Sequence, residues 1–477
     1  MNWKMQKHIY DERLSQSMLY TEAGKVTKSI GLVFEAHLPG AGVGSLCHIL
    51  PSGDRTLSQA QGAVEAEVIG FRDKRILLKP FEEVHGVNKD SLVVLKKKVS
   101  SITVGSALLG RVLDGQGNPI DGKGDIDFSS THSEERGLYQ KPTHVLDRAV
   151  VAEPLDLGVR CINGLLTCGQ GQRMGIMAGS GVGKSVLMGM MARRTQADIN
   201  VIALIGERGR EVREFIERDL GPEGLKRSVV VVSTSDKSPL LRMRGAFLGT
   251  AIAEYFRDQG KSVLFLMDSV TRFCMAQREI GLSMGEPPAS KGYTPSVFAT
   301  IPKLLERAGT SPGQGSITGL YTVLVEGDDM DDPIADSVRS ILDGHIVLSR
   351  KIAQRNHFPA IDVLQSTSRV MRSVIGQDHL EWASQIREWM ATYAQVEDLI
   401  NIGAYVKGSN PKIDQAVAVH SRIIDFLRQK VDESCDMKET LSRMHSIFRA
   451  GEAAISGQQM QPNPRQNQPN GSSRLQF

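Results

Sequence analysis

One stretch of eight residues limits the possible folds of this chain more than any other part of its sequence. The stretch reads Ala178-Gly-Ser-Gly-Val-Gly-Lys-Ser185, follows an apolar run and precedes a helical pattern that begins at Val186. Its glycines allow backbone N–H groups to turn inward around phosphate oxygens, and the first turn of the helix adds the positive end of its dipole. It therefore predicts a strand–loop–helix unit that binds phosphate. The predicted binding residues are Gly179, Ser180, Gly181, Val182, Gly183, Lys184, Ser185 and Val186.

Two side chains at the end of this loop supply charge and metal-binding chemistry. Lys184 is expected to neutralise the β- and γ-phosphates of a nucleotide, and Ser185 to place its hydroxyl on Mg²⁺. Ala178 stands where the general pattern has its first glycine, a change that the loop tolerates if Ala178 keeps a negative φ angle. ATP and Mg²⁺ are therefore the expected cofactors.

Hydrolysis also needs a group that orients water and a carboxylate near the metal. An apolar run ends in Asp268, and another leads into Glu207. Ligands gather where parallel strands end, so we expect Asp268 to reach the magnesium shell through water, unless it caps the next helix. Glu207 is the predicted residue that polarises the attacking water, because its strand is the next one after the loop. Glu211 is a second candidate, although the arginines beside it favour a structural ion pair.

The hydrophobic pattern divides the chain into segments. Residues 25–97 alternate in short apolar runs between Gly, Pro and Asp, which predicts a small antiparallel barrel or sandwich. Residues 98–375 alternate continuous apolar runs with helical patterns, which predicts a mostly parallel sheet covered on both faces. Residues 376–455 repeat apolar side chains at helical spacing. Residues 1–24 carry a loose helical stripe, for packing or docking, and residues 456–477 are rich in Gln, Asn, Pro and Gly, which predicts disorder.

Composition restricts the environment and the partners of the protein. Lys and Arg number 57 and Asp and Glu 54, so the net charge of +3 gives no sign of nucleic-acid or membrane binding. The five cysteines are scattered without a Cys-X-X-Cys pair, which favours reduced thiols over disulfides or a zinc site. The apolar runs are far shorter than the roughly 18 residues of a membrane span, and the N-terminus lacks a signal-peptide pattern. We therefore expect a cytoplasmic protein.

Several longer strings carry a family resemblance. They are Glu153-Pro-Leu-Asp-Leu-Gly-Val-Arg160, the loop at 178–185, Gly206-Glu-Arg-Gly-Arg-Glu211 and Met267-Asp-Ser-Val-Thr-Arg-Phe273, followed by matches at 276–288, 291–298, 325–333 and 358–363. These strings look like the catalytic subunits of rotary-type ATPases. Within that group they most closely resemble the flagellum-specific protein-export ATPases, which belong to the type III secretion ATPases.

The resemblance implies an α/β RecA-like P-loop ATPase core, an N-terminal all-β barrel and a C-terminal helical domain, assembled as a ring of six identical subunits. It implies that Lys184 and Ser185 belong to the nucleotide loop, that Glu207 is the catalytic carboxylate and that Asp268 is the acid on the metal side. Each of these assignments matches the one that the residues suggest by themselves.

The resemblance also assigns residues farther along the chain. Arg369, in Ser366-Thr-Ser-Arg369, matches an arginine finger that reaches into a neighbouring subunit, where such a charge contributes about 10³–10⁵ in rate. Phe358 matches an aromatic residue near the adenine, and the acidic loop at 328–332 matches a pore-facing loop that touches a central stalk. If Glu207 and Arg369 serve different faces of one subunit, each active site is completed only at an interface.

The function that the resemblance implies is ATP hydrolysis that powers type III export, most closely of flagellar components. The implied partners are other copies of the chain, a stator-like regulatory protein, a coiled-coil stalk protein, export chaperones and substrates, and a membrane export gate at the inner face of the cell membrane.

Other functions stay open at this point. A virulence-type secretion ATPase shares nearly every motif, although Thr294 and the string at 326–332 resemble the flagellar proteins more. The catalytic subunit of an ATP synthase would need a partner subunit to form its sites. A nucleotide-binding scaffold would assemble without turnover. A nucleic-acid translocase is disfavoured by the near-neutral charge and the missing basic-aromatic surface, so we expect no nucleic-acid partner.

Overall fold

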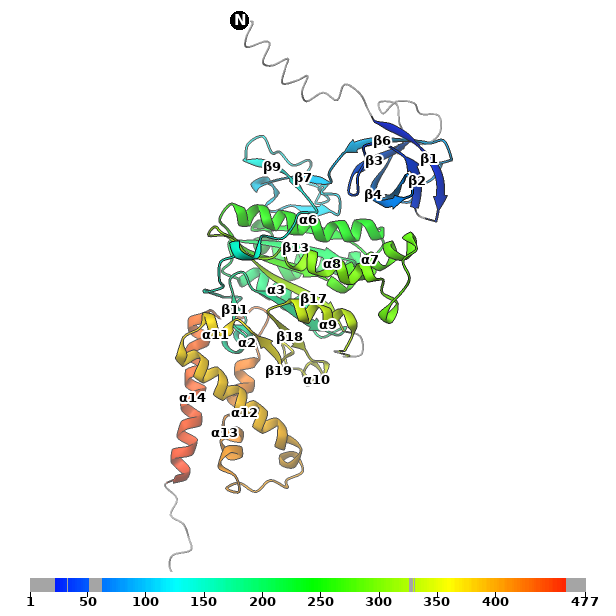
Figure 1. Cartoon of the computed structure of the whole chain (residues 1–477). Helices are drawn as coiled ribbons and strands as arrows, with labels where there is room; N and C mark the ends of the chain where they lie inside the picture. Colours follow the sequence, from blue (N-terminus) through cyan, green and yellow to red (C-terminus); the bar gives the residue numbers. More distant parts are fainter. Residues whose placement is uncertain (1–21, 32, 51–61, 326–328, 330, 460–477) are drawn as a thin grey trace, which may run out of the picture.

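The computed structural model describes residues 22–31, 33–50, 62–325, 329 and 331–459, and three parts follow one another along its long axis (Figure 1). A β-barrel occupies one end, an α/β part the middle and a group of helices the other end. Most of the predicted helical segment 1–24 and most of the predicted tail 456–477 lie outside the described residues. Residues 456–459, which we predicted as part of the disordered tail, are instead the last residues of helix α14.

The barrel forms because its strands place apolar side chains at every second position. Its strands are β1 (Ala23–Ile30), β2 (Val33–His37), β3 (Leu46–Leu50), β4 (Val64–Arg72), β5 (Arg75–Pro80) and β6 (Leu92–Lys97). They close in the order β1-β2-β5-β4-β3-β6, and every neighbouring pair is antiparallel. Side chains two residues apart, such as Cys47 with Ile49 and Ala66 with Val68, fill its interior. The prediction of an N-terminal all-β barrel is therefore confirmed.

Short elements link the barrel to the central part. They are β7 (Ser101–Gly105), η2 (Ser106–Leu108), β8 (Val112–Asp114), β9 (Ser133–Gly137), η3 (Val145–Asp147), β10 (Pro154–Leu155), α2 (Arg160–Leu165) and β11 (Cys168–Gly169). Strands β7 and β9 pair antiparallel, as do β10 and β11, whereas β8 joins the edge of the central sheet.

The central sheet has the order β19-β18-β12-β17-β15-β13-β14-β8. Its strands are β12 (Arg173–Ala178), β13 (Ile199–Ile205), β14 (Ser228–Ser233), β15 (Ser262–Asp268), β17 (Ser316–Leu324), β18 (Gly344–Leu348) and β19 (Ile361–Ser368), with β16 (Gly309–Thr310) beside β17. All neighbours from β18 to β8 are parallel, whereas β19 and β16 are antiparallel. The mostly parallel sheet is thus confirmed.

Both faces of this sheet are covered, which explains why its strands are apolar throughout. In β13, Ile202 and Leu204 face one hydrophobic core, and Val201, Ala203 and Ile205 face the other. Helices α3 (Lys184–Arg194), α4 (Gly209–Glu214), η4 (Phe215–Leu220) and α5 (Gly221–Lys226) pack mainly on the first core. Helices α6 (Pro239–Asp258), α7 (Val270–Met284), α8 (Pro295–Leu305) and α9 (Pro333–Ile341) pack on the second, and η5 (Ser290–Gly292) precedes α8.

The helical end of the molecule continues the first core. It follows α10 (Arg350–Gln354) and α11 (Met371–Val374) and consists of α12 (Gln377–Asn401), α13 (Pro411–Leu427) and α14 (Met437–Gln459). Buried side chains of these helices, including Ile386, Trp389 and Phe426, belong to the same core as the sheet residues Ile176 and Leu348. The helical domain is therefore packed on the ATPase core without a separate hydrophobic centre.

A buried polar network joins the barrel to the central part. Tyr139 donates to Glu67 Oε1 at 2.7 Å, and Arg244 of α6 lies 3.3 Å from Glu67 Oε2. Glu67 and Arg244 are 3% and 3% exposed. Burial raises the pKa of Glu67, although Arg244 and Tyr139 oppose that shift. The network therefore depends on its pairing, because either charge would be costly if it were buried alone.

Replacement of Arg244 by alanine tests this network. Removal of one partner of a buried ion pair costs about 3–5 kcal/mol, so Arg244→Ala should lower the free energy of unfolding by that amount in urea titrations followed by circular dichroism. The control is Arg210→Ala, which removes the exposed pair with Glu214 at 2.9 Å and should leave the free energy of unfolding nearly unchanged, because water screens the charges. Equal losses from the two variants would contradict a stabilising role for the network.

Candidate active site

The phosphate-binding loop joins the end of β12 to the start of α3. Gly181 and Gly183 have φ angles of 77° and 88°, in the left-handed region that suits glycine. A Cβ atom on Gly181 would meet nothing within 4 Å, whereas one on Gly183 would lie 3.6 Å from the Phe358 ring. Ala178 ends β12 and is not among the described residues with positive φ. The alanine is therefore compatible with the loop, as the sequence required.

Side chains from the first turn of α3 and from three strands meet in front of this loop. Lys184 Nζ lies 2.5 Å from Asp268 Oδ1 and 3.6 Å from Glu207 Oε1. Thr322 Oγ1 donates to the same Asp268 oxygen at 2.6 Å. Asp268 ends β15, Glu207 follows β13 and Thr322 lies in β17. The structure thus brings together the lysine and both carboxylates that the sequence singled out.

The reason we gave for the position of Glu207 needs correction. Strand β13 follows the loop in the sequence, but β17 and β15 separate it from β12 in the sheet. Glu207 is close to the loop because parallel strands all end at the same edge, where ligand sites form. The position of Glu207 near the loop therefore does not require β13 to be a neighbour of β12.

The electrostatics of this cluster follow from burial and mutual contact. Burial, together with the nearby Asp268 charge, raises the pKa of Glu207 to about 7, although Lys184 opposes the shift. Burial alone would lower the pKa of Lys184, but the Asp268 and Glu207 carboxylates raise it above its usual value. Glu207 Oε1 is buried and has no hydrogen-bond partner among the described residues. Such an acceptor can bind a water molecule near the loop.

The donor set suits magnesium bound together with a nucleotide. The described residues contain no group of three or more His, Cys, Asp or Glu side chains that could hold a metal alone. Mg²⁺ usually takes one or two protein oxygens, with phosphates and water as its other ligands. Ser185 in the first turn of α3 and Asp268 at the end of β15 offer two oxygens beside the loop. These residues therefore fit Mg²⁺ that arrives with the phosphates.

The other predicted nucleotide-binding residues lie in different surroundings. Phe358 is 43% exposed and lies beside Gly183, where its ring is free to contact a ligand. Ser180 and Val186 are exposed on the loop and the first turn of α3. Val182, in contrast, is 2% exposed and packs into the hydrophobic core. Any contact of Val182 with phosphate must therefore be made by its backbone.

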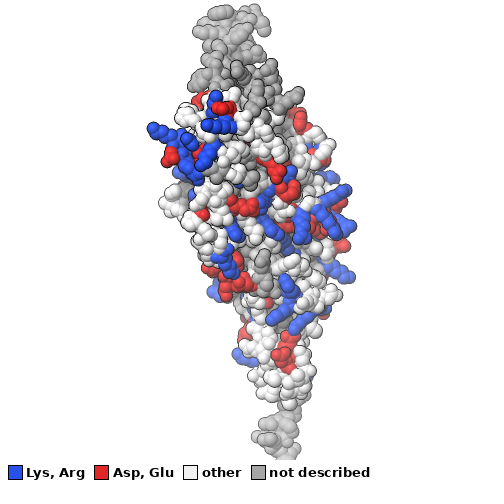
Figure 2. Space-filling model, turned by 90° about the vertical axis from the view of Figure 1, so that its right-hand side faces the viewer, with Lys and Arg blue, Asp and Glu red and all other residues white. Residues whose placement is uncertain are grey.

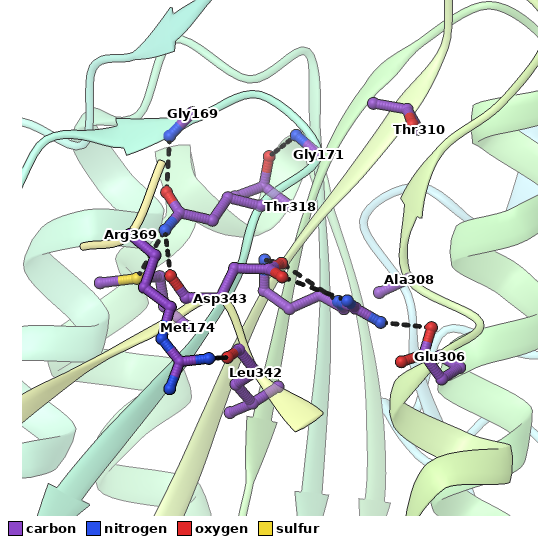
Figure 3. A network of polar contacts seen from close by, with 12 residues as sticks. Gly169, Gly171, Met174, Glu306, Ala308, Thr310, Thr318, Leu342, Asp343 and Arg369 are labelled. Carbon is purple, nitrogen blue, oxygen red and sulfur yellow. Dashed lines mark hydrogen bonds and ion pairs between the residues drawn. The ribbon is translucent and has the colours of Figure 1, made fainter. Parts of the chain in front are cut away.

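Arg369 lies away from this cluster. It follows β19, its backbone N–H donates to Asp343 O at 3.0 Å, and its guanidinium donates to Leu342 O at 3.3 Å. Asp343 in turn pairs with Arg173, the first residue of β12 (Figure 3). Arg369 is exposed. It therefore lies at the amino end of β12, whereas the phosphate-binding loop leaves the carboxyl end of the same strand.

Two residues near the cluster were missed by the sequence analysis. Thr322 fixes Asp268, and no sequence signal marks it. Arg272 lies in the first turn of α7 and packs against Gly206. A Cβ atom added to Gly206 would come within 2.6 Å of the arginine Cβ. The Arg272 Nε is buried without a hydrogen-bond partner among the described residues. Its position within the string at 267–273, next to Asp268, was the available signal.

Two further predictions concern acidic residues. Glu211 forms a 3.4 Å pair with Arg208, as we expected from the neighbouring arginines, and both side chains are exposed. The acidic loop at 328–332 lies partly outside the described residues. Within it, Asp329 and Asp332 pair with Lys291 at 3.0 and 3.6 Å.

Comparison with known proteins shows which family this chain belongs to. Residues 158–368 match the model of the ATP synthase alpha/beta family, nucleotide-binding domain, and residues 375–446 match that of the T3SS EscN ATPase C-terminal domain. The flagellum-specific ATP synthase of Bacillus subtilis is 52% identical over 428 residues, which cover 90% of this chain and 95% of that protein. The type 3 secretion system ATPase of Sinorhizobium fredii is 50% identical over 89% of this chain and 92% of its own length. The chain belongs to the flagellum-specific and type III secretion ATPase family.

Solved structures agree with this family assignment. The assembled ATPase EscN of the enteropathogenic E. coli type III secretion system has a TM-score of 0.82 and 47% identity, over 90% of this chain and 100% of that one. EscN in complex with its central stalk EscO has a TM-score of 0.81 and 46% identity, over 89% and 99% of the two chains. The RecA-like core with a barrel and a helical domain is thereby confirmed, and the chain is an ATP-hydrolysing enzyme of type III secretion.

Two surface properties of this ATPase are relevant to its partners. Lys and Arg side chains are interspersed with Asp and Glu over the face seen in Figure 2. Among the described residues, no helix has the length and apolar content that a membrane span requires.

The raised pKa of Glu207 predicts how ATPase activity depends on pH. If Glu207 takes up a proton from the attacking water, as the sequence predicts, it must be ionised, so kcat/KM for ATP should fall as the pH drops through about 7. This parameter reports groups of the free enzyme, and initial rates at low ATP and saturating Mg²⁺ measure it. Glu207→Gln should lose about 10²–10⁴ in rate and should lack this acidic limb. An unchanged limb in Glu207→Gln would assign the titration to another group.

Proposed function

We propose that this chain is a flagellar export ATPase that acts as a homohexameric ring, with each active site completed by Arg369 of a neighbouring subunit. The observation that carries the proposal is the position of Arg369 relative to the loop of its own subunit. Strand β12 has six residues, and at ~3.3 Å per residue its ends lie about 17 Å apart. An arginine side chain does not span that distance across a packed core. If Arg369 acts on ATP, it acts on the ATP of another subunit.

The residues of one subunit then divide the reaction as follows. The N–H groups of residues 179–185 bind the phosphates, and Lys184 moves from Asp268 to the β- and γ-phosphates. Glu207 orients the attacking water and accepts its proton as the water oxygen bonds to the γ-phosphorus and the bond from that phosphorus to the β–γ bridging oxygen breaks, which releases ADP and phosphate. The guanidinium of the neighbour's Arg369 stabilises the charge that develops on the transferred phosphoryl group. Phe358 packs against the adenine.

Magnesium has a defined place in this scheme. Bound through Ser185, and through water to Asp268, it would neutralise charge on the β- and γ-phosphates. Release of Asp268 from its 2.5 Å contact with Lys184 makes the carboxylate available to that shell. Thr322 holds the same carboxylate in place from β17.

The export system and its partners are assigned by resemblance. EscN was solved in complex with its central stalk EscO, and we propose that this chain likewise engages a coiled-coil stalk protein. The further partners proposed are a stator-like regulatory protein, export chaperones with their substrates, and a membrane export gate, so that the ring works in the cytoplasm at the inner face of the membrane. A virulence-type system is the second candidate, because relatives of both kinds are about equally similar to this chain.

Mixed rings test whether neighbouring subunits share their sites. Lys184→Ala and Arg369→Ala should each be nearly inactive alone, since each lacks one part of every site. Random mixing in equal amounts pairs an intact loop with an intact neighbouring arginine at about a quarter of the interfaces, so ATPase activity should recover to that fraction. Arg213→Ala is a control for loss of an exposed arginine, because Arg213 pairs with Glu217 on the surface, and it should retain activity.

The outcome that contradicts shared sites is equally clear. A mixture with no more activity than the sum of its separate components would show that Arg369 does not complete the neighbour's site. A chain that stays inactive until a different subunit is added would instead be the catalytic subunit of an ATP synthase.

A further inference from the structure

The segment that carries Arg369 is held less firmly by the sheet than its neighbours are. Within the described part of the chain, strand β19 is the edge strand of the sheet and pairs with β18 alone, and the register between the two strands shifts between His345 and Val347. Leu364 and Gln365, within β19, are exposed. Among the described residues, the guanidinium of Arg369 has one hydrogen-bond acceptor, Leu342 O. The ladder reaches Ser368 and therefore supports the segment of Arg369 from one side only.

A buried amide adds support from outside the ladder. Gln172, just before β12, is 0% exposed. Its Nε2 donates to Asp343 O and to Ser368 Oγ, each at 3.1 Å. Its Oε1 accepts from the backbone N–H of Gly169 at 2.9 Å. Because one end contacts a donor and the other contacts carbonyl and hydroxyl acceptors, the orientation of this amide is fixed by its surroundings.

Both acceptors of this amide are connected to Arg369 directly. Asp343 O also accepts from the backbone N–H of Arg369 at 3.0 Å, and Ser368 is the preceding residue in the chain. Ser368 Oγ in turn donates to Thr167 O at 2.8 Å. Gln172 thus links the turn before β18 to the end of β19. One of its partners bonds the backbone of Arg369, and the other is the residue before Arg369.

The turn that Gln172 contacts is itself braced. Arg173 contacts the Asp343 carboxylate through Nε and Nη2, each at 3.2 Å, and pairs with Glu306 at 2.5 Å. Figure 3 shows Asp343 between Arg369 on one side and Glu306 on the other. Asp343, which accepts a hydrogen bond from Gln172, is therefore held by several contacts. The Gln172 amide links it to the segment that carries Arg369.

We infer that Gln172 is a positioning residue for the neighbouring active site: it sets the direction of Arg369 without touching ATP. The inference rests on the proposed function, since it concerns how Arg369 reaches another subunit. A displacement of about 1 Å in a transition-state contact costs up to about 10²-fold in rate. Gln172→Met keeps the volume and removes both donors and the acceptor. It should lower kcat by about 10- to 100-fold and leave KM for ATP nearly unchanged.

The decisive test places this substitution on one chain or the other of a mixed ring. In rings of Lys184→Ala with Arg369→Ala, each working site takes its arginine from the Lys184→Ala chain. Gln172→Met on the Lys184→Ala chain should therefore abolish most of the recovered activity. The same substitution on the Arg369→Ala chain should leave it unchanged, because that chain supplies no arginine. Equal losses from both placements would overturn the inference, since a general structural defect has no such asymmetry.

Two additional variants keep the test decisive. Thr318→Val is the matched control: Thr318 Oγ1 accepts from Gly171 N–H at 2.8 Å and is as buried as Gln172, but it does not contact the segment of Arg369. Any loss of activity that it causes should be equal in the two placements. Ser368→Ala removes one partner of the amide with a smaller change and should show the same asymmetry as Gln172→Met, even if Gln172→Met does not fold.

The parent mixture separates this inference from the proposed function. If Lys184→Ala and Arg369→Ala without a further substitution recover no activity, shared sites fail and the positioning role fails with them. If the parent mixture recovers and the placement of Gln172→Met makes no difference, only the role of Gln172 is wrong.

Discussion

The direction of one parallel strand determines how this ATPase is organised. Strand β12 delivers the phosphate-binding loop at its carboxyl end, because helix N-termini and strand ends gather at that edge of a parallel sheet. Its amino end contacts Asp343, which holds Arg369. A rigid strand between the two groups keeps them apart within a subunit. Catalysis that uses both groups therefore requires at least two subunits, and a closed ring gives every subunit the same pair of neighbours.

The chemistry of the loop was readable from sequence because it is local. The glycines were expected to let the backbone turn inward, and Gly181 and Gly183 indeed adopt left-handed φ angles just before Lys184 begins the helix. Asp268 and Glu207 were also found, because acids that follow apolar strands collect at one edge of a parallel sheet. The sequence did not yield the order of the strands, since β17 comes much later in the chain than β13 and yet pairs with β12. Thr322 depends on that order and was missed.

The location of Arg369 was a matter of family resemblance, and its support was invisible before the structure. Gln172 is a polar residue between a turn and a strand, and nothing in its neighbourhood of the sequence marks it as buried. Its partners Asp343 and Ser368 lie far along the chain. Long-range hydrogen bonds of this kind arise from packing of the sheet edge. They leave no local pattern of hydrophobicity or spacing that a sequence analysis can detect.

Specific ATPase activity measured over a wide range of protein concentration tests the shared-site account most directly. Subunits that complete one another's sites should lose activity per chain upon dilution, because dissociation removes Arg369 from every loop. Addition of an excess of the double variant Lys184→Ala/Arg369→Ala to a dilute sample should not restore activity, although it restores assembly, because that variant supplies neither an intact loop nor an arginine. A specific activity that stays constant upon dilution to fully monomeric protein, as established by sedimentation, would contradict the account.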